Sequence, residues 1–251
     1  MDKWTREEEI IALDLYCKIP FKSSSKNNPE VIKIANLIGR TPSAVNMKIG
    51  NFGSFDNRLK EQGIVGLSNA SKLDKEIFYE FNGKWDELAY ESKKLIAKFN
   101  GEQILDNYKD IPNGYEKETL IKQRVNQQFF RQAVLASYNG ACCITGLSNP
   151  ELLVASHIKP WKDSTSNEKT DPKNGLCLNS LYDKAFDRGF ITISDKYEII
   201  VSNKIRDICN GESVDKFFNV LKGHKINLPE KFLPQKEYLQ YHNDCIYENW
   251  E

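Results

Sequence analysis

The residues best suited to chemistry lie in one stretch of the sequence, residues 141–193. His157 comes just after the apolar run Leu152–Ala155, and Pro160 closes the segment, so His157 is expected at the end of a strand. An imidazole with a pKa near neutral can take a proton from water as that water attacks phosphorus. A single histidine after a strand is more often structural, so its interpretation depends on the residues downstream.

An asparagine follows the histidine after a long polar loop, residues 162–173. Asn174 opens the motif Asn174-Gly175-Leu176. Its side-chain amide can hydrogen-bond to the loop backbone and hold the two halves of a site in register. Taken alone, Asn174 is simply a turn residue.

Two acids occupy the helix that is expected next, with Asn179 or Ser180 as its cap. Asp183 and Asp187 are four residues apart, so they lie side by side on the helix. Asp183 could instead serve a capping box with Ser180. Asp187 opposes the helix dipole and needs a compensating cation, either Arg188 or a metal ion. Oxygen ligands without thiolates favour Mg²⁺ or Mn²⁺ over zinc.

These motifs together resemble the HNH nucleases, the ββα-metal class, over about residues 131–193. One branch of that family reads C-x-x-T-G, A-H-I-x-P, N-G-L and F-D-R-G. The corresponding residues here are Cys142-Cys143-Ile144-Thr145-Gly146, Ser156-His157-Ile158-Lys159-Pro160, Asn174-Gly175-Leu176 and Phe186-Asp187-Arg188-Gly189. The resemblance implies a nuclease fold around a metal site.

The resemblance also assigns roles to single residues. It makes His157 the general base and Asn174 the asparagine that fixes the loop, and it gives Asp183 the metal-ligand position of the last histidine. Asp187 is then a second metal ligand or an outer partner, and Ser156 contributes through its hydroxyl or a water. The implied cofactor is one divalent metal per chain, Mg²⁺ or Mn²⁺, without a structural zinc.

The sequence departs from the family pattern at several positions. Ser156 stands where many HNH proteins have an acid or a histidine before the base. The last histidine is replaced by Asp183, or by Tyr182 if the alignment is shifted by one residue. Asn179 and Tyr182 occupy positions where a structural zinc needs cysteine or histidine.

The N-terminal third contains the pattern of a helix-turn-helix. A helix after Asn28 ends at Gly39, and Thr41 and Pro42 can cap and open the next one, which carries Met47 toward a core. Ser43, Asn46 and Lys48 are then expected to face outward, with Arg40 beside them to meet a phosphate. An ordinary helical hairpin with a solvated face is an equally good interpretation.

The segment from Lys117 to Tyr138 is expected to form an amphipathic helix whose polar face is basic and rich in amides. Such a face suits phosphates and base edges, although a solvated helix face is the commoner explanation. The predicted nucleic-acid contacts are Arg40, Ser43, Asn46, Lys48, Lys122, Arg124, Arg131, Lys159 and Arg188.

Composition limits the possible settings. The 35 basic and 35 acidic side chains give a formal net charge of zero, so a nucleic-acid surface must be a local patch. No apolar run approaches the roughly 20 residues of a membrane span, and no signal peptide is recognisable, so a cytoplasmic location is expected. The six cysteines lack a paired C-x-x-C spacing, which favours reduced and mostly buried thiols.

The sequence thus predicts an α+β protein of two domains. Residues 1–100 are expected to form a helical DNA-recognition domain, 101–117 a linker and 118–251 an HNH endonuclease domain. The predicted function is a restriction-type endonuclease that cuts double-stranded DNA as a homodimer. Two alternatives are a DNA-binding regulator with an inactive HNH fold and a nuclease that requires a modified base.

Overall fold

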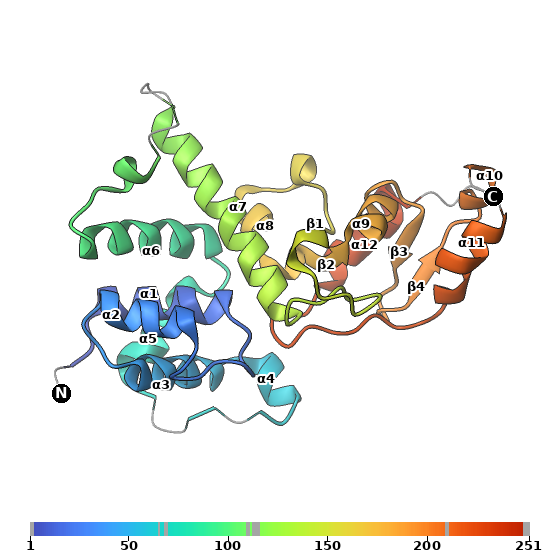
Figure 1. Cartoon of the computed structure of the whole chain (residues 1–251). Helices are drawn as coiled ribbons and strands as arrows, with labels where there is room; N and C mark the ends of the chain where they lie inside the picture. The colour runs from blue at the N-terminus through green and yellow to red at the C-terminus, as the bar shows by residue number, and fades with distance from the viewer. Residues whose placement is uncertain are drawn as a thin grey trace.

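A computed structural model describes residues 3–64, 66–67, 70–108, 111, 116–208 and 211–247. Its helices and short strands pack around two hydrophobic cores, and helix α7 (Lys117–Ser137) runs between them (Figure 1). The mixture of helices with two small sheets is consistent with the expected α+β class. Within the expected linker, residues 109–110 and 112–115 lie outside the described residues.

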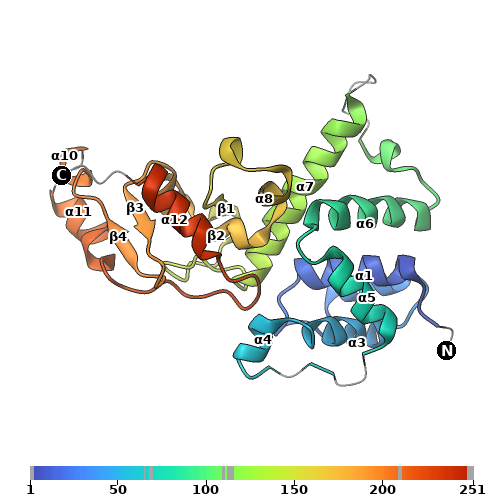
Figure 2. The ribbon, with the colours of Figure 1, turned by 180° about the vertical axis from the view of Figure 1, so that it is seen from behind.

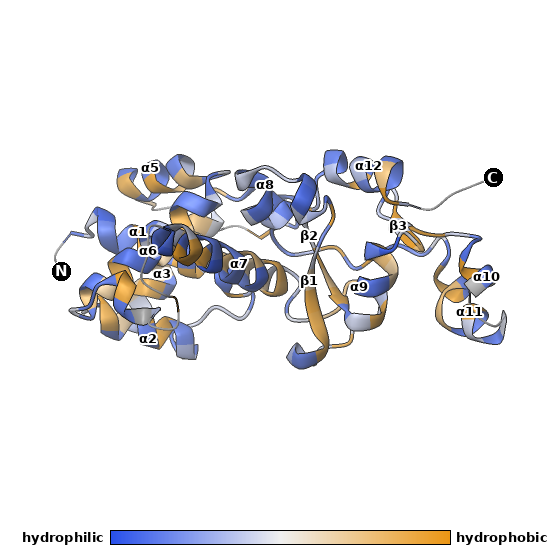
Figure 3. Cartoon of the chain, turned by 90° about the horizontal axis from the view of Figure 1, so that it is seen from above, coloured by the Kyte–Doolittle hydropathy of each residue, from blue (hydrophilic) through white to orange (hydrophobic). Residues whose placement is uncertain are grey.

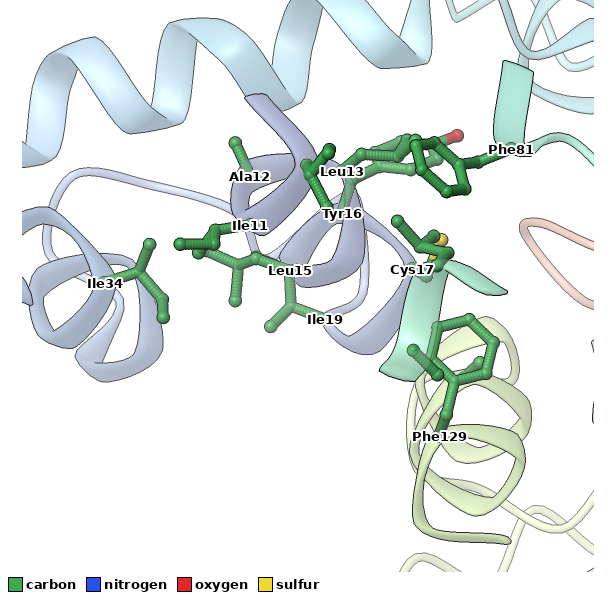
Figure 4. Close-up of a cluster of buried hydrophobic side chains, with 14 of the residues drawn as sticks. Ile11, Ala12, Leu13, Leu15, Tyr16, Cys17, Ile19, Ile34, Phe81 and Phe129 are labelled. Atoms are coloured by element: carbon green, nitrogen blue, oxygen red, sulfur yellow. The ribbon is translucent and has the colours of Figure 1, made fainter. Parts of the chain in front are cut away.

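The N-terminal unit is helical. Its elements are α1 (Arg6–Lys18), α2 (Pro29–Leu37), α3 (Pro42–Gly53), α4 (Asn57–Glu61), α5 (Lys72–Phe81), α6 (Trp85–Phe99) and η1 (Ile104–Asn107). A capping box between Thr5 and Glu8 starts α1, which is buried along most of its length because α3, α5, α6 and α7 all pack against it. Figure 4 shows its apolar side chains beside Phe81 and Phe129.

Helices α2 and α3 pack on each other across a short turn in which Gly39 adopts a φ of 68°. Thr41 caps α3 by accepting a hydrogen bond from the Ala44 backbone N–H. The prediction that Lys48 faces outward is wrong, because it lies on the buried stripe of α3 and is 7% exposed. Its ammonium pairs with Glu9 at 2.5 Å and with Asp74. Met47, expected in the core, lies on the opposite face and is 59% exposed.

The second unit contains two antiparallel strand pairs. Its elements are η2 (Pro150–Leu152), β1 (Leu153–His157), η3 (Trp161–Asp163), α8 (Ser166–Thr170), η4 (Pro172–Asn174), β2 (Gly175–Asn179), α9 (Ser180–Asp187), β3 (Ile191–Ile193), β4 (Ile199–Val201), α10 (Ile205–Ile208), α11 (Gly211–Phe217), η5 (Asn219–Leu221) and α12 (Lys236–Cys245). β1 pairs with β2, and β3 pairs with β4. Helix α12 packs against β3 (Figure 2), and the apolar residues of β1 and β2 stand out in Figure 3.

The pairing of β1 with β2 brings His157 opposite Gly175, next to Asn174. Gly175 is required there, because a Cβ at this position would lie 2.4 Å from Cγ2 of Val134 in α7. The close approach of β2 to α7 therefore fixes the strand end on which the site depends.

A segment before α12, residues 229–232, packs against the N-terminal unit. The Glu230 carboxylate accepts hydrogen bonds from the backbone N–H groups of Phe21 and Lys22, both at 3.1 Å. The buried ammonium of Lys231 donates to backbone carbonyls at the end of α1, including that of Ile19 at 2.8 Å. Phe232 packs on Trp85 in the first core.

Among the described residues, no helix has the length and apolar character needed to cross a membrane. Four cysteines in the described part of the chain, Cys17, Cys142, Cys143 and Cys177, are free and buried, whereas Cys245 is free and exposed. Cys209 lies outside the described residues.

Candidate active site

His157 is held at the end of β1 by three contacts. Its ring stacks on Phe130 of α7 with centroids 3.7 Å apart and planes within 8°. Trp161 meets the same ring edge-on at 5.6 Å. Nε2 lies 3.0 Å from the backbone carbonyl of Lys169 in α8. Burial lowers the pKa of His157 below its ordinary value, and the hydrogen bond to Lys169 opposes that shift.

These contacts define the tautomer of the imidazole. A carbonyl oxygen only accepts hydrogen bonds, so Nε2 of His157 carries the hydrogen. In the neutral ring the lone pair is then on Nδ1. Among the described residues, none forms a hydrogen bond with Nδ1. The side chain is therefore oriented as a base whose accepting nitrogen is open.

Asn174 fixes the loop that leads from His157 to β2. The side chain is fully buried, its Oδ1 accepts from the Lys159 backbone N–H at 2.8 Å, and its Nδ2 donates to the backbone carbonyls of Lys159 and Glu168 at 3.2 and 3.1 Å. Its own backbone carbonyl accepts from the Ile158 N–H. Asn174 thus ties both ends of the loop together.

Asp183 and Asp187 on α9 share a cleft of about 690 Å³ with His157. Asn179, rather than Ser180, caps α9, and its Oδ1 accepts from two backbone N–H groups. Burial raises the pKa of Asp183, and the nearby Ser156 hydroxyl opposes the rise. Burial and then the charge of Asp183 raise the pKa of Asp187. Two carboxylates that disfavour each other's ionisation can be relieved by a cation.

The donors around these acids fit a divalent metal. The buried Ser156 Oγ has no hydrogen-bond partner of good geometry within the described residues, so it is a polar atom that a metal or its water can satisfy. The oxygens of Ser156, Asp183 and Asp187 suit Mg²⁺ or Mn²⁺. Among the described residues, no three histidine, cysteine or acidic side chains gather into a metal cluster, so this set includes a hydroxyl and leaves positions for water.

Tyr182 is the alternative occupant of the last histidine's position, and its side chain has a structural partner. Tyr182 is 5% exposed, and its hydroxyl donates to the backbone carbonyl of Phe217 at 2.7 Å. It does not line the cleft, whereas Asp183 does. The neighbouring Leu181 is 47% exposed. The helix therefore presents Asp183 and Asp187, and not Tyr182, to His157.

The cleft is bordered by three exposed cations, Lys162, Lys184 and Arg188. Within the described part of the chain, none of the three makes an ion pair. Lys184 and Arg188 both lower the pKa of Asp187 through their charge, so they lie near the acids. Their charges are available to phosphate groups.

The other predicted nucleic-acid contacts are mostly occupied within the chain. Arg40 pairs with Glu8 at 2.9 Å, Lys122 with Asp86 at 3.5 Å and Lys159 with Glu168 at 2.8 Å. Arg131 donates to the backbone carbonyls of Leu153 and Pro150 at 3.0 and 3.3 Å. Ser43 and Arg124 are exposed and Asn46 is half-buried. Lys159 lies between two residues that line the cleft, Ile158 and Pro160, and the others lie on α3, on α7 or in the turn before α3 and do not line it.

The sequence did not identify Phe130, Trp161, Lys162 or Lys184 as parts of this site. Phe130 lies on the face of α7 next to the core, where an aromatic residue signals only packing. Trp161 directly follows the Ser156–Pro160 motif, and Lys184 lies between the two acids. Closeness to these motifs in the sequence could have identified both residues as parts of the site.

Comparison with known families agrees with this geometry. Residues 142–194 match the model of a family described as HNH endonuclease. The match supports an HNH domain in this segment. It spans His157, Asn174, Asp183 and Asp187, and it supports a nuclease activity in general. No curated protein matches the chain.

Proposed function

We propose that this protein is a metal-dependent endonuclease of restriction type that hydrolyses phosphodiester bonds in double-stranded DNA. The observation that carries the proposal is the open Nδ1 of His157 in a cleft shared with Asp183 and Asp187. A base and a pair of acids on two walls of one cleft suit attack of water on phosphorus. The HNH match supports the class of reaction.

In this proposal Nδ1 of His157 accepts the proton of the attacking water. The imidazolium that forms keeps its Nε2–H donated to the Lys169 carbonyl, and this hydrogen bond favours the charged ring. Stacking on Phe130 prevents the ring from turning as it becomes charged. The lowered pKa of His157 keeps the neutral form available at neutral pH.

Asp183, Asp187 and Ser156 would hold one Mg²⁺ or Mn²⁺, which supplies Lewis-acid stabilisation to the phosphorane and the 3′ leaving oxygen when bound. Lys162, Lys184 and Arg188 bind the phosphates on either side of the reacting one. Asn174 acts as a positioning residue, because it holds the loop that carries the Lys169 carbonyl against His157.

The N-terminal unit supplies further DNA contacts in the same proposal, with α2 and α3 as a helix-turn-helix and Ser43 and Asn46 as its contact residues, and Arg124 of α7 adds another contact. A homodimer would cut both strands with one site per chain. The organisation into an N-terminal recognition unit and a C-terminal nuclease unit is part of this proposal.

The proposal is tested by incubating supercoiled plasmid with the full chain and Mg²⁺ or Mn²⁺. Nicked and linear products are expected, and EDTA should abolish them. Asp183→Asn should raise the metal concentration needed for half-maximal cleavage at least about tenfold, because it removes one anionic ligand. Glu91→Gln, in the N-terminal unit, is the matched control and should leave that concentration unchanged.

A second candidate is a DNA-binding regulator with an inactive HNH fold. It is favoured by the replacement of the last histidine and by the absence, among the described residues, of three histidine, cysteine or acidic side chains in one cluster. Retention of DNA binding without cleavage under any divalent metal would establish the regulator and exclude the nuclease.

A further inference from the structure

A second cavity lies where the two units meet, apart from the cleft of His157. It has a volume of about 400 Å³ and is lined by α4 and α5 of the N-terminal unit and by Lys173 and residues 232–237 of the second unit. Small-ligand sites are commonly cavities of roughly 300–1,000 Å³ at the junction of two units. The proposed catalysis uses none of these lining residues.

The wall from the N-terminal unit is aromatic. Phe55 and Tyr79 lie with ring centroids 6.0 Å apart, and Tyr79 is 54% exposed. The buried ring of Phe78 packs against both, with centroids 5.5 Å from Phe55 and 5.4 Å from Tyr79. An exposed aromatic ring supported by a buried aromatic ring is a surface on which another flat ring can stack.

The remaining wall is polar but carries no excess charge. Three basic residues, Arg58, Lys173 and Lys236, and three acidic residues, Asp56, Glu61 and Glu237, line it. Arg58 pairs with Glu61, and Asp56 accepts the Tyr16 hydroxyl and caps α4.

Three polar side chains of this wall remain available. In the described part of the chain, the side chains of Asn82, Lys173 and Lys236 have no hydrogen-bond or ion-pair partner. Together with Glu237 they offer both donors and acceptors around the aromatic surface. A flat, neutral ring with donors and acceptors on its edge matches this lining, whereas a strongly charged ligand does not.

We propose that this cavity binds a nucleobase, stacked on Tyr79 and read at its edge by Asn82, Lys173 and Lys236. The base comes either from a free nucleoside or from a DNA strand in which it is unpaired. The cavity adjoins the loop of His157, because Lys173 precedes Asn174 and its carbonyl accepts from the Gln235 N–H at 3.2 Å. A base bound in the cavity would therefore contact Lys173, the residue next to Asn174 in the chain. The proposal does not depend on strand cleavage.

The first arm of the test is calorimetric titration of the full chain with each of the four 2′-deoxynucleosides. Saturable binding of at least one is expected. Tyr79→Ala should raise its Kd at least about fivefold, the lower end of the effect of losing one base stack. Tyr79→Phe should keep the Kd within about twofold. Phe217→Ala, which removes a 42% exposed aromatic ring outside the cavity, should leave it unchanged.

The second arm uses a His157→Ala background, in which cleavage is blocked, and compares a fully paired duplex with one that contains a single unpaired base. Tighter binding of the second duplex that is lost in Tyr79→Ala identifies DNA as the source. A Tyr79 effect with nucleosides alone identifies the free nucleoside. If Tyr79→Ala changes neither, or if Phe217→Ala has the same effect, the proposal is wrong. Because both arms measure binding, their failure leaves the nuclease proposal standing.

Discussion

Two histidines line the same cleft and have almost the same surroundings, yet only one is arranged as a base. His157 stacks on Phe130 and His242 stacks on Phe186, each with ring centroids 3.7 Å apart. Each lies with Nε2 close to a backbone carbonyl, that of Lys169 at 3.0 Å and that of Phe186 at 3.1 Å. The ring position and the Nε2 hydrogen bond therefore do not distinguish a catalytic from a structural histidine.

The difference lies at Nδ1. In His242 this nitrogen accepts the hydroxyl of Thr192 at 2.8 Å, so every polar atom of the ring is satisfied. In His157 no described residue forms a hydrogen bond with Nδ1, and the ring lines the cleft that also holds the acids. Burial lowers the pKa of both, to about 4 for His242. A histidine with a strongly lowered pKa and hydrogen bonds at both ring nitrogens has a structural role. A histidine with one ring nitrogen free of hydrogen bonds is available for catalysis.

The largest effect is expected for His157→Ala. Removing a general base typically costs about 10² to 10⁴ in rate, so single-turnover cleavage of plasmid DNA should fall by at least about a hundredfold. The thermal midpoint should change little compared with that effect, since the lost side chain is only partly buried. A variant that cleaves within tenfold of the wild-type rate would remove His157 from the mechanism.

A smaller effect is expected for Asn174→Ala. The substitution empties a fully buried side-chain position, leaves the partly buried Lys159 N–H without its 2.8 Å partner and frees the loop that orients His157. We expect a cleavage rate about tenfold to a hundredfold lower and a free energy of unfolding about 1–3 kcal/mol lower. Denaturant unfolding and plasmid cleavage measure the two. Unchanged cleavage by a destabilised variant would show that loop position does not matter for the reaction.

His242→Ala should lower stability more than it lowers the cleavage rate. It removes a stacked ring and two hydrogen bonds from a fully buried place, so the free energy of unfolding should fall by about 2–4 kcal/mol. The cleavage rate per folded molecule, measured after correction for the folded fraction, should stay within about tenfold of wild type. A fall in cleavage rate comparable to that of His157→Ala would show that His242 is also needed for the reaction.

The pH dependence of stability gives a finer comparison. The folded pKa of His242 is about 4 and its ordinary value is 6.5, so between these values the unfolded chain binds a proton that the folded chain does not. The contribution of neutral His242 to the free energy of unfolding is complete above pH 6.5 and is lost as pH falls toward 4. Thermal midpoints measured across this range should fall less steeply in His242→Gln than in wild type. Equal slopes would show that His242 titrates normally in the fold.

The sequence predicted the local elements of the site but not the directions of its side chains. The apolar run before His157 and the spacing of Asp183 and Asp187 are local patterns, and the strand end and the helix follow from them. Lys48 was misplaced because its burial depends on Glu9 and Asp74, which come from two other helices and compensate its charge.

Other features depend on contacts that no local pattern contains. The stacking of Phe130 on His157 requires α7 to cross the β1–β2 pair, and the close packing at Gly175 shows how tightly that crossing is fixed. The same is true of the open Nδ1, because it is defined by what surrounds the ring and not by the residues beside it in the sequence. For that reason the sequence could name His157 but could not say why it differs from His242.

The most direct test of the account is the pH dependence of the single-turnover cleavage rate in wild type and in His242→Gln. The account predicts that the rate rises with pH as one group loses a proton, with a midpoint below 6.5 because burial lowers the pKa of His157. The midpoint should be the same in the variant, because His242 takes no part in proton transfer. A midpoint above 6.5, or a midpoint that moves when His242 is replaced, would contradict it.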